Sequence, residues 1–284
     1  MKILDKNFKD ISNVSLILGF FDGVHAGHRE VIKNTPNNEK VLVTFSKSPA
    51  EFFGREFRYI YSRENNYNLI EKLGIDYIYE QDFSEIVSNS ADEYLQFLIK
   101  KFSPISITTG FNHTFGANRL GNPDFIKNYT KNFEYFCTPA TKINGETVSS
   151  TRIKELLSLG NIKKANEFLI DNFTIESSVI KGAQLGRNLG FPTANLKYPK
   201  NIIKIPYGVY KVKVFDKPAV MNWGIKPTIG SDEIIEVHIP NFTEDLYNKE
   251  LQIEIISKIR DEKKFSNLDD LKEQIKKDVE ECLK

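Results

Sequence analysis

The stretch Gly182-Ala-Gln-Leu-Gly186-Arg187-Asn-Leu-Gly190-Phe-Pro192-Thr193-Ala-Asn195 combines a glycine-rich turn, an arginine and two short oxygen-bearing side chains. Its glycines let backbone N–H groups approach an anion closely, and a run of such donors suits phosphate oxygens. Thr193 and Asn195 lie two positions apart, so in an extended segment both side chains point to one face, where a hydroxyl and an amide oxygen suit Mg²⁺. The stretch predicts a phosphate and metal site that is not a Walker A loop, because it contains no G-x-x-x-x-G-K-[ST]. A glycine-rich corner of a β-barrel would equally explain any one of these glycines.

Downstream of this stretch, apolar and polar residues alternate with a period of two, as in half-buried strands. The clearest runs are residues 210–214 and 251–255. Several such strands fit between residues 174 and 257, which predicts a small, closed or nearly closed antiparallel barrel. The chain ends in an amphipathic helix from about Asn267 with Ser266 as its N-cap. We expect its apolar stripe to cap the barrel rather than to bind a cofactor; the stripe consists of Leu268, Leu271, Ile275, Val279 and Leu283.

The first half of the chain instead alternates short apolar strands with amphipathic helices, the pattern of a doubly wound α/β domain. Ser90 followed by Glu93 predicts the capped start of one such helix. The change of pattern near Phe173 predicts two domains, residues 1–172 and residues 173–284. The predicted strands are residues 14–18, 41–45, 77–79, 105–109 and 135–137.

Composition narrows the possible environments and partners. The 284 residues include 39 basic and 38 acidic side chains, so no overall basic field favours nucleic acid. The apolar run at residues 14–21 is too short to span a bilayer, and charges before it interrupt any signal peptide. The two cysteines, Cys137 and Cys282, support neither a disulfide framework nor a zinc site. We expect a cytoplasmic protein that binds neither nucleic acid nor membranes.

A second anion site is predicted where the earliest strand runs into Gly19-Phe20-Phe-Asp22-Gly23-Val-His25-Ala-Gly27-His28. A helix should begin near Ala26, and its free N–H groups and dipole favour a phosphate. His25 and His28, three residues apart, can converge on one side of that helix. A lone histidine would more often be structural, and binding of a metal by the pair lacks further ligands.

These motifs resemble those of the bacterial bifunctional riboflavin kinase/FMN adenylyltransferase (FAD synthetase) family. H-A-G-H, with the glycines and aspartate before it, resembles the nucleotidylyltransferase signature, and the Pro-Thr-Ala-Asn at residues 192–195 resembles the riboflavin kinase loop. The resemblance covers essentially the whole chain. It implies an N-terminal Rossmann-like nucleotidylyltransferase domain that makes FAD and pyrophosphate from FMN and ATP. It further implies a barrel domain that makes FMN and ADP from riboflavin and ATP.

The resemblance also implies roles for individual residues. His25 and His28 would stabilise charge on the α-phosphate of ATP, without a covalent enzyme intermediate. The implied ATP-binding residues of the N-terminal half are Gly19, Phe20, Asp22, Gly23, Gly27, Asn112, Ser149, Ser150, Thr151, Arg152 and Lys154. Those of the barrel half are Gly182, Gly186, Arg187, Gly190 and Pro192. The implied Mg²⁺ ligands are Thr193 and Asn195, and the implied flavin contacts are Phe115, Arg260 and Phe265.

Glu236 stands in an alternating segment in which Ile235, Val237 and Ile239 share one face. Glu236 and His238 should therefore point away from the barrel interior. A glutamate at such a place is more often simply solvated. The resemblance instead implies a catalytic general base that deprotonates the 5′-hydroxyl of riboflavin.

Departures from the family pattern cluster in the N-terminal half. His113 and Thr114 stand where the family usually has an aromatic residue and an arginine, and Lys154 replaces another arginine. Ser46-Lys47-Ser48-Pro49 replaces a Pro-His-Pro-like element. Lysine keeps the charge but loses the bidentate fork of arginine. The alternative function is therefore a riboflavin kinase alone, with a degenerate N-terminal module acting as a scaffold or flavin-binding regulator.

Overall fold

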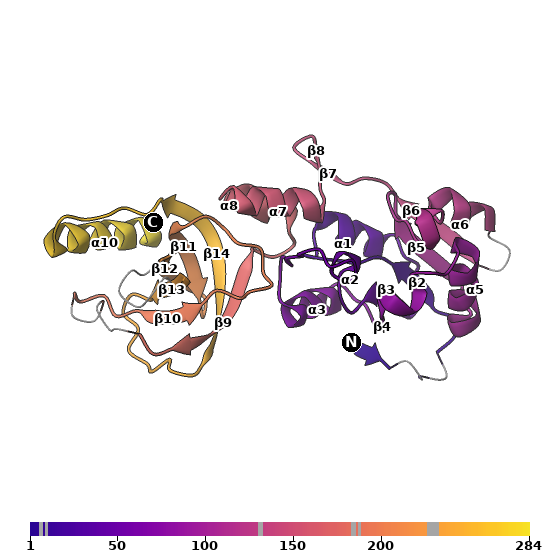
Figure 1. The fold of residues 1–284 in the computed structure, drawn as a ribbon, viewed down its shortest axis with the longest axis horizontal. Coiled ribbons are helices and arrows are strands. Elements are labelled where there is room, and N and C mark those ends of the chain that lie inside the picture. The colour runs from indigo at the N-terminus through magenta and orange to yellow at the C-terminus, as the bar shows by residue number, and fades with distance from the viewer. Residues whose placement is uncertain (6–7, 9–10, 130–132, 183–185, 187–188, 226–232) are drawn as a thin grey trace. The chain divides into compact units, whose positions relative to one another are not determined.

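The computed structural model describes residues 1–5, 8, 11–129, 133–182, 186, 189–225 and 233–284 (Figure 1). Contacts between Cα atoms divide the chain into two compact units. Unit 1 consists of Met1–Phe57 and Arg63–Ser150, and unit 2 consists of Arg58–Ser62 and Thr151–Lys284. Each unit is described by itself below.

Unit 1 is built on a parallel six-stranded sheet with the strand order β1-β4-β3-β2-β5-β6. The predicted α/β domain is confirmed, and each of the five predicted strands has a counterpart in this sheet. The strands are β1 (Lys2–Leu4), β2 (Ser15–Leu18), β3 (Lys40–Phe45), β4 (Tyr77–Gln81), β5 (Ser106–Gly110) and β6 (Glu134–Thr138). The chain adds β3 on one side of β2 and β5 on the other, so a topological switch point lies beside β2. Ligands of open α/β sheets bind outside the carboxyl ends of strands at such a point.

Helices connect the strands of unit 1 as the alternating pattern predicts. The helices are α1 (Ala26–Lys33), α2 (Pro49–Phe52), α3 (Arg63–Lys72), α4 (Phe83–Ile86), α5 (Ala91–Phe102), the 3₁₀ helix η1 (Ala117–Arg119) and α6 (Pro123–Tyr129). A small hairpin of β7 (Lys142–Ile143) and β8 (Glu146–Thr147) follows. The predicted capping box of α5 is confirmed, since Glu93 N donates to Ser90 Oγ (3.2 Å) and Ser90 N donates to Glu93 Oε2 (2.7 Å). This cap fixes the start of a helix that buries Tyr94, Leu95, Leu98 and Phe102 against the sheet.

Unit 2 contains the predicted antiparallel barrel, which is closed in the order β10-β13-β12-β11-β14-β9. Its strands are β9 (Thr174–Ile180), β10 (Ala194–Lys197), β11 (Gly208–Val214), β12 (Lys217–Ile225), β13 (Glu233–His238) and β14 (Glu250–Arg260). The barrel interior is filled by side chains, with Trp223 fully buried and its Nε1 donating to Ile205 O at 3.0 Å. Among the described residues, the helices after unit 1's sheet are α7 (Ser150–Ser158), α8 (Ile162–Phe168) and α10 (Leu268–Leu283).

Helix α10 differs from its prediction in two respects. Its N-cap is Asn267 rather than Ser266, because Asn267 has the extended backbone of a cap and its Oδ1 accepts from Asp270 N at 2.8 Å. The helix contacts β11 and β12, and Cys282 Sγ donates to Ala219 O at 3.1 Å. The predicted five-residue stripe is wrong at both ends, since Leu268 and Leu283 are 59% and 56% exposed. At the C-terminal end the buried positions are Asp278 and Cys282, so Leu283 lies outside the packed face of the helix.

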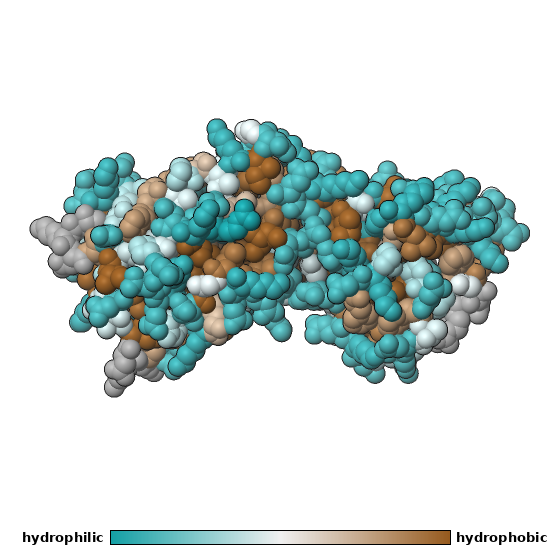
Figure 2. Space-filling view, turned by 180° about the vertical axis from the view of Figure 1, so that it is seen from behind, coloured by the Kyte–Doolittle hydropathy of each residue, from teal (hydrophilic) through white to brown (hydrophobic). Residues whose placement is uncertain are grey.

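The surface is mainly polar. On the face drawn in Figure 2, apolar residues lie in small separate groups among hydrophilic ones. Within the part of the chain that the structure describes, no helix has the length and hydropathy to cross a membrane.

Candidate functional site

The loop that follows β2 is shaped by two glycines and an asparagine from α3. A Cβ atom on Gly19 would lie 2.7 Å from the Phe21 ring, and Gly23 has a φ of +76°. Asn66 holds the loop from the side, because its Nδ2 donates to Phe21 O (2.9 Å) and its Oδ1 accepts from Gly23 N (3.1 Å). The glycines therefore allow a tight turn whose backbone is fixed by a distant side chain.

His25 and His28 converge at the start of α1, as the sequence predicts. His25 is the N-cap, and its Nδ1 accepts from His28 N at 3.2 Å, while His28 Nδ1 accepts from His25 N at 3.5 Å. Their rings stack with centroids 3.6 Å apart, and the Phe21 ring stacks on His28 at 4.3 Å. A Cβ on Gly27 would come within 3.0 Å of the His25 ring, so this close packing needs glycine there.

The histidine pair is uncharged at neutral pH. Burial lowers the pKa of His25 to about 4. Burial, and secondarily the neighbouring His25, hold the pKa of His28 well below its usual value. Since each Nδ1 accepts a backbone N–H, the proton of each neutral ring is on Nε2. The pair therefore offers two Nε2–H donors in fixed orientations.

Further predicted residues lie around this loop. Ser150 Oγ donates to Asp22 O at 2.7 Å, which ties the start of α7 to the loop after β2. Asn112 lies in the turn directly after β5, the neighbour of β2 in the sheet. The sheet therefore brings the loop that precedes α1 and the turn with Asn112 to the same edge.

The predicted phosphate turn coincides with the start of α7, as expected for a helix N-terminus. Ser149 precedes the helix, and Ser150 and Thr151 form its first two positions. Arg152 Nη1 pairs with Glu155 Oε2 at 2.8 Å on the same helix, and Lys154 lies within its second turn.

A cavity of about 670 Å³ opens beside this loop within unit 1. Its wall is rich in aromatic residues, and the Phe45, Phe52 and Phe53 rings pack edge-on against Phe83 at 5.4–5.8 Å. Phe115 also lines it, in close contact with Gly121, where a Cβ would lie 2.5 Å from the ring. Such a wall suits a planar ring system. The lining residues include Gly19, Phe20, Phe45, Phe53, Phe83, Tyr94, His113, Thr114 and Phe115.

Two of the departures from the family pattern lie in defined local surroundings. Ser48 is the N-cap of α2, because Ala50 N donates to Ser48 Oγ at 3.2 Å and Ser48 N donates to Glu51 Oε2 at 3.0 Å. His113 stacks on Phe115 with ring centroids 5.8 Å apart. Its Nε2 is buried without a hydrogen-bond partner among the described residues, and burial lowers its pKa to about 4.

We predict that His113→Phe stabilises unit 1 and reduces its acid sensitivity. A buried unpaired nitrogen costs about 1–3 kcal/mol, which phenylalanine does not incur. In the unfolded chain His113 binds a proton near its ordinary pKa of 6.5, whereas the folded protein resists protonation until about pH 4. Above pH 6.5 the His113 ring is neutral in both states and does not lower the free energy of unfolding. As the pH falls from 6.5 toward 4, protonation of the unfolded chain lowers that free energy, by about 2 kcal/mol at pH 5.

Calorimetric unfolding of the parent and His113→Phe at pH 7 and pH 5 measures this effect. The difference in stability between the two proteins should be larger at pH 5. An equal difference at both pH values would contradict the role of His113 in acid sensitivity.

The barrel carries a row of polar side chains across three neighbouring strands. In the antiparallel register, Glu236 on β13 lies opposite Asn195 on β10 and opposite Asn222 on β12. Ile235 and Val237 are buried, while Glu236 and His238 are partly exposed. The prediction that Glu236 and His238 face away from the barrel interior is confirmed.

The glycine-rich stretch approaches this row very closely. A Cβ on Gly182 would lie 2.4 Å from Asn195 Cγ, and one on Gly186 would lie 2.4 Å from Phe191 O and 3.3 Å from Thr193 Oγ1. Gly190 has a φ of +89°. Pro192 O accepts a hydrogen bond from His238 Nδ1 at 2.9 Å, which ties the stretch to β13. The predicted residue Arg187 lies outside the described residues.

Thr193 and Asn195 fit the chemistry of a magnesium site. They supply a hydroxyl oxygen and an amide oxygen, and Gly182 and Gly186 let the glycine-rich stretch pack directly against them. Asn195 Nδ2 donates to Thr193 O at 3.5 Å, which connects the two residues. Among the residues that the structure describes, no group of three histidine, cysteine or acidic side chains could hold a metal. A cation here would therefore need phosphate oxygens of the substrate as additional ligands.

A cavity of about 260 Å³ on the outside of the barrel brings the predicted residues of unit 2 together. Gly186 and Thr193 come from the glycine-rich stretch, Glu236 from β13, and Arg260 and Phe265 from the end of β14 and the segment after it. Helix α10 forms the opposite wall. The lining residues are Gly186, Leu189, Phe191, Thr193, Val209, Val220, Asn222, Glu236, His238, Arg260, Glu262, Lys263, Phe265, Leu271, Ile275, Asp278 and Val279.

Comparison with known proteins identifies the family. Residues 7–152 match the family model for FAD synthetase, and residues 169–284 match the model for riboflavin kinase. The bifunctional riboflavin kinase/FMN adenylyltransferase of Buchnera aphidicola subsp. Schizaphis graminum is 34% identical, with 96% of this chain and 95% of the relative covered. The chain belongs to the bifunctional riboflavin kinase/FMN adenylyltransferase family. The relative of the same name from Haemophilus influenzae is 33% identical, with 95% of this chain and 93% of the relative covered.

The fold of this bifunctional enzyme is also found in a solved structure. A protein from Streptococcus pneumoniae described as a macrolide-efflux protein is 28% identical and superposes with a TM-score of 0.88, covering 97% of this chain and 95% of its own. Both family domains are present, which supports a riboflavin kinase/FMN adenylyltransferase over a riboflavin kinase alone.

Sequence reasoning missed several residues at the two sites of this riboflavin kinase/FMN adenylyltransferase. Phe21 lies within the motif that predicts the histidine site, but its stacking on His28 depends on its positive φ of 49°. Asn66 has no sequence signal, because it acts on a loop 43 residues away. Asp278 could have been found from the sequence, because it lies four residues before Cys282 and therefore on the same face of the helix. The structure shows that this face is buried.

Proposed function

We propose that the barrel cavity is where riboflavin is phosphorylated and that Glu236 is the general base of this reaction. Its carboxylate would take the proton of the 5′-hydroxyl, whose oxygen attacks the γ-phosphorus of ATP while the bond to ADP breaks. The observation that supports this role is the row of Asn195, Glu236 and Asn222, with Glu236 and Asn222 lining the cavity. The two asparagines would orient the carboxylate and the phosphate that approaches it.

We propose that Thr193 and Asn195 would hold Mg²⁺, which offsets the negative charge of the triphosphate when bound. Their backbone position is set by Gly182 and Gly186, whose missing side chains let the stretch lie directly against them. The backbone N–H groups near Gly186 and Gly190, together with Pro192 and Arg187, would bind the phosphates of ATP. Arg260 and Phe265 would contact the flavin ring in the same cavity.

We predict that Thr193→Val weakens riboflavin phosphorylation by raising the Mg²⁺ concentration needed for half-maximal rate. The substitution keeps the shape of the side chain and removes one oxygen donor. Conversion of supplied FMN to FAD should not change. Thr174→Val is a matched control in the same barrel, because the Thr174 hydroxyl donates to Asn172 O and lies outside the cavity. An unchanged Mg²⁺ titration for Thr193→Val would exclude its role as a ligand.

For adenylyl transfer, we propose that a phosphate oxygen of FMN attacks the α-phosphorus of ATP and that pyrophosphate leaves. The Nε2–H groups of His25 and His28 would donate to the α-phosphate oxygens as negative charge increases on them. Neutral donors are available throughout the physiological pH range because burial keeps both rings uncharged. The aromatic cavity with Phe20 and Phe115 would receive the isoalloxazine ring.

The remaining N-terminal residues would position the triphosphate. Gly19, Asp22, Gly23 and Gly27 shape the loop and the start of α1. The hydroxyls of Ser149, Ser150 and Thr151 lie at the start of α7, where free N–H groups favour phosphate. Asn112, Arg152 and Lys154 would complete the ATP site.

We propose that residues 1–172 form the adenylyltransferase domain and residues 173–284 the kinase domain. The family models match residues 7–152 and residues 169–284, which supports two domains that meet close to the proposed boundary. A cytoplasmic location remains a prediction from the sequence.

Chromatography of flavins after incubation with riboflavin, ATP and Mg²⁺ tests the complete proposal. Both FMN and FAD should accumulate. Formation of FMN alone, with supplied FMN left unconverted, would exclude adenylyl transfer.

A further inference from the structure

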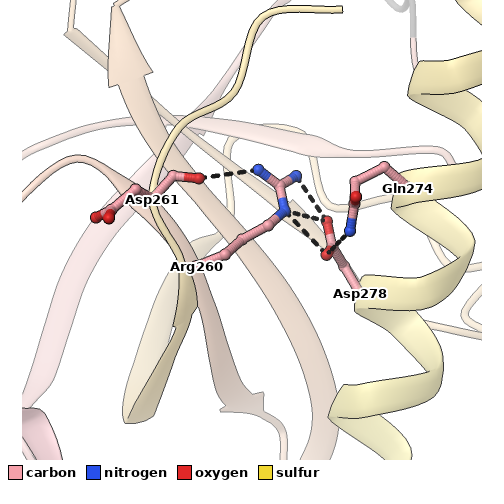
Figure 3. A network of polar contacts seen from close by, with 4 residues as sticks. All are labelled: Arg260, Asp261, Gln274 and Asp278. Atoms are coloured by element: carbon pink, nitrogen blue, oxygen red, sulfur yellow. Dashed lines mark hydrogen bonds and ion pairs between the residues drawn. The ribbon is translucent and has the colours of Figure 1, made fainter.

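Helix α10 holds the guanidinium of Arg260 through an ion pair with a buried aspartate. Arg260 Nη2 donates to Asp278 Oδ2 at 2.7 Å, and Arg260 Nε donates to Oδ1 and Oδ2 at 3.0 and 3.1 Å (Figure 3). Arg260 Nη1 donates to Asp261 O at 3.0 Å. Figure 3 shows the Arg260 side chain extending from the end of β14 toward the helix that carries Asp278. The guanidinium is thus fixed on two of its edges.

This arrangement leaves part of the guanidinium available to a ligand. Of the five N–H groups of an arginine, three have partners among the described residues, and the other two are one on each terminal nitrogen. Arg260 lines the barrel cavity, and its Cζ lies 5.9 Å from the centroid of the Phe265 ring, which also lines it. The two remaining donors therefore belong to a rigid group at the cavity wall.

The carboxylate of Asp278 is itself held in a fixed orientation. Its side chain is only 4% exposed, and Gln274 Nε2, one helical turn earlier, donates to Oδ1 at 3.0 Å. An ion pair with a buried aspartate contributes little net stability, because desolvation of the carboxylate offsets much of the attraction. Val279 and Cys282 already provide apolar contacts between α10 and the barrel. Packing of the helix therefore does not account for a charged residue at this position.

We propose that Asp278 is a positioning residue of the riboflavin kinase reaction, which acts through Arg260. By binding one edge of the guanidinium it directs the two remaining N–H groups toward hydrogen-bond acceptors of the flavin ring. This inference rests on the flavin contact proposed for Arg260, and it makes α10 a functional part of the flavin site.

The test compares steady-state kinetics of the full-length chain and four variants: Asp278→Asn, Arg260→Met, the double variant and Glu281→Gln. Glu281→Gln is the matched control, since it removes an acidic group one turn away on α10 that pairs with the exposed Lys284. Asp278→Asn should raise the KM for riboflavin about tenfold, as expected for loss of one charged partner. The KM for ATP and the conversion of supplied FMN to FAD should stay within about twofold. The double variant should have the same riboflavin KM as Arg260→Met, and Glu281→Gln should match the parent.

Two results would overturn the role of Asp278. One is an unchanged riboflavin KM in Asp278→Asn. The other is an equal further increase when Asp278→Asn is added to Arg260→Met, because Asp278 would then act independently of Arg260. An unchanged riboflavin KM in Arg260→Met would instead refute the proposed flavin contact of Arg260 itself.

A milder variant keeps the proposal testable if Asp278→Asn does not fold. Gln274→Leu preserves the carboxylate and removes only the hydrogen bond that orients it. A smaller increase in riboflavin KM, about two- to threefold, is then expected. A riboflavin KM equal to that of the parent would count against Asp278 as a positioning residue.

Discussion

Glu236→Gln is expected to lower the rate of FMN formation by about 10²–10⁴-fold, the usual contribution of a general base. The substitution preserves the size of the side chain and its place between Asn195 and Asn222 but removes its ability to accept the riboflavin proton. Conversion of supplied FMN to FAD should continue at the parent rate, since Glu236 lies in unit 2 and the histidine pair proposed for adenylyl transfer lies in unit 1. Separate assays with riboflavin and with FMN as the flavin substrate measure both effects.

Glu233→Gln provides a matched control on the same strand. Glu233 pairs with Lys204 and Tyr207 and does not line the barrel cavity. The Glu233→Gln variant should therefore keep full riboflavin kinase activity. If Glu236→Gln phosphorylates riboflavin as fast as Glu233→Gln, the assignment of Glu236 as the base is wrong.

His28→Ala should remove most FAD synthesis and leave riboflavin phosphorylation intact. Loss of one donor to a transition state costs about 2–4 kcal/mol, or roughly 30- to 1,000-fold in rate. The change also removes the ring stacked between Phe21 and His25, so circular dichroism should accompany the assay to confirm that the unit remains folded. Adenylyl transfer at the parent rate in a folded His28→Ala protein would refute the role of this residue.

The same histidines give a pH prediction for the parent enzyme. Because burial lowers the pKa of His25 to about 4, the ring stays neutral and its Nδ1 keeps accepting the His28 N–H, which holds the pair in place, down to about pH 5. Loss of adenylyltransferase activity through this group should begin only as the pH falls toward 4. A pH–rate profile with a histidine titration near 6.5 would show that the ring works in its charged form.

Local signals in the sequence predicted much of the fold. The capping box at Ser90 and Glu93 and the alternation around Glu236 depend on neighbouring residues, and both were correct. Strand β1 was missed because its three residues are too few to show a period, and its pairing with β4 is distant in sequence. At α10, two adjacent polar residues could each serve as the N-cap, and only the backbone geometry decides for Asn267.

The candidate sites were predictable to the extent that their residues lie in continuous motifs. The histidine pair and the stretch with Thr193 and Asn195 are of this kind. The contacts of Asn66 with the loop after β2, and of Asp278 with Arg260, join elements far apart in the chain. Such contacts depend on tertiary packing, which no short pattern encodes.

The position of Glu236 on the outside of a filled barrel means that different residues determine the stability of the barrel and the shape of the proposed substrate site. Substitutions of interior residues such as Trp223 and Ile235 would change the stability of the barrel, whereas the proposed phosphorylation site lies on its outer wall. The width of the substrate chamber is set instead by α10 and the segment that follows β14. Flavin analogues with bulkier rings could therefore be accommodated by redesigning these two elements, with the hydrogen-bonded cylinder left intact.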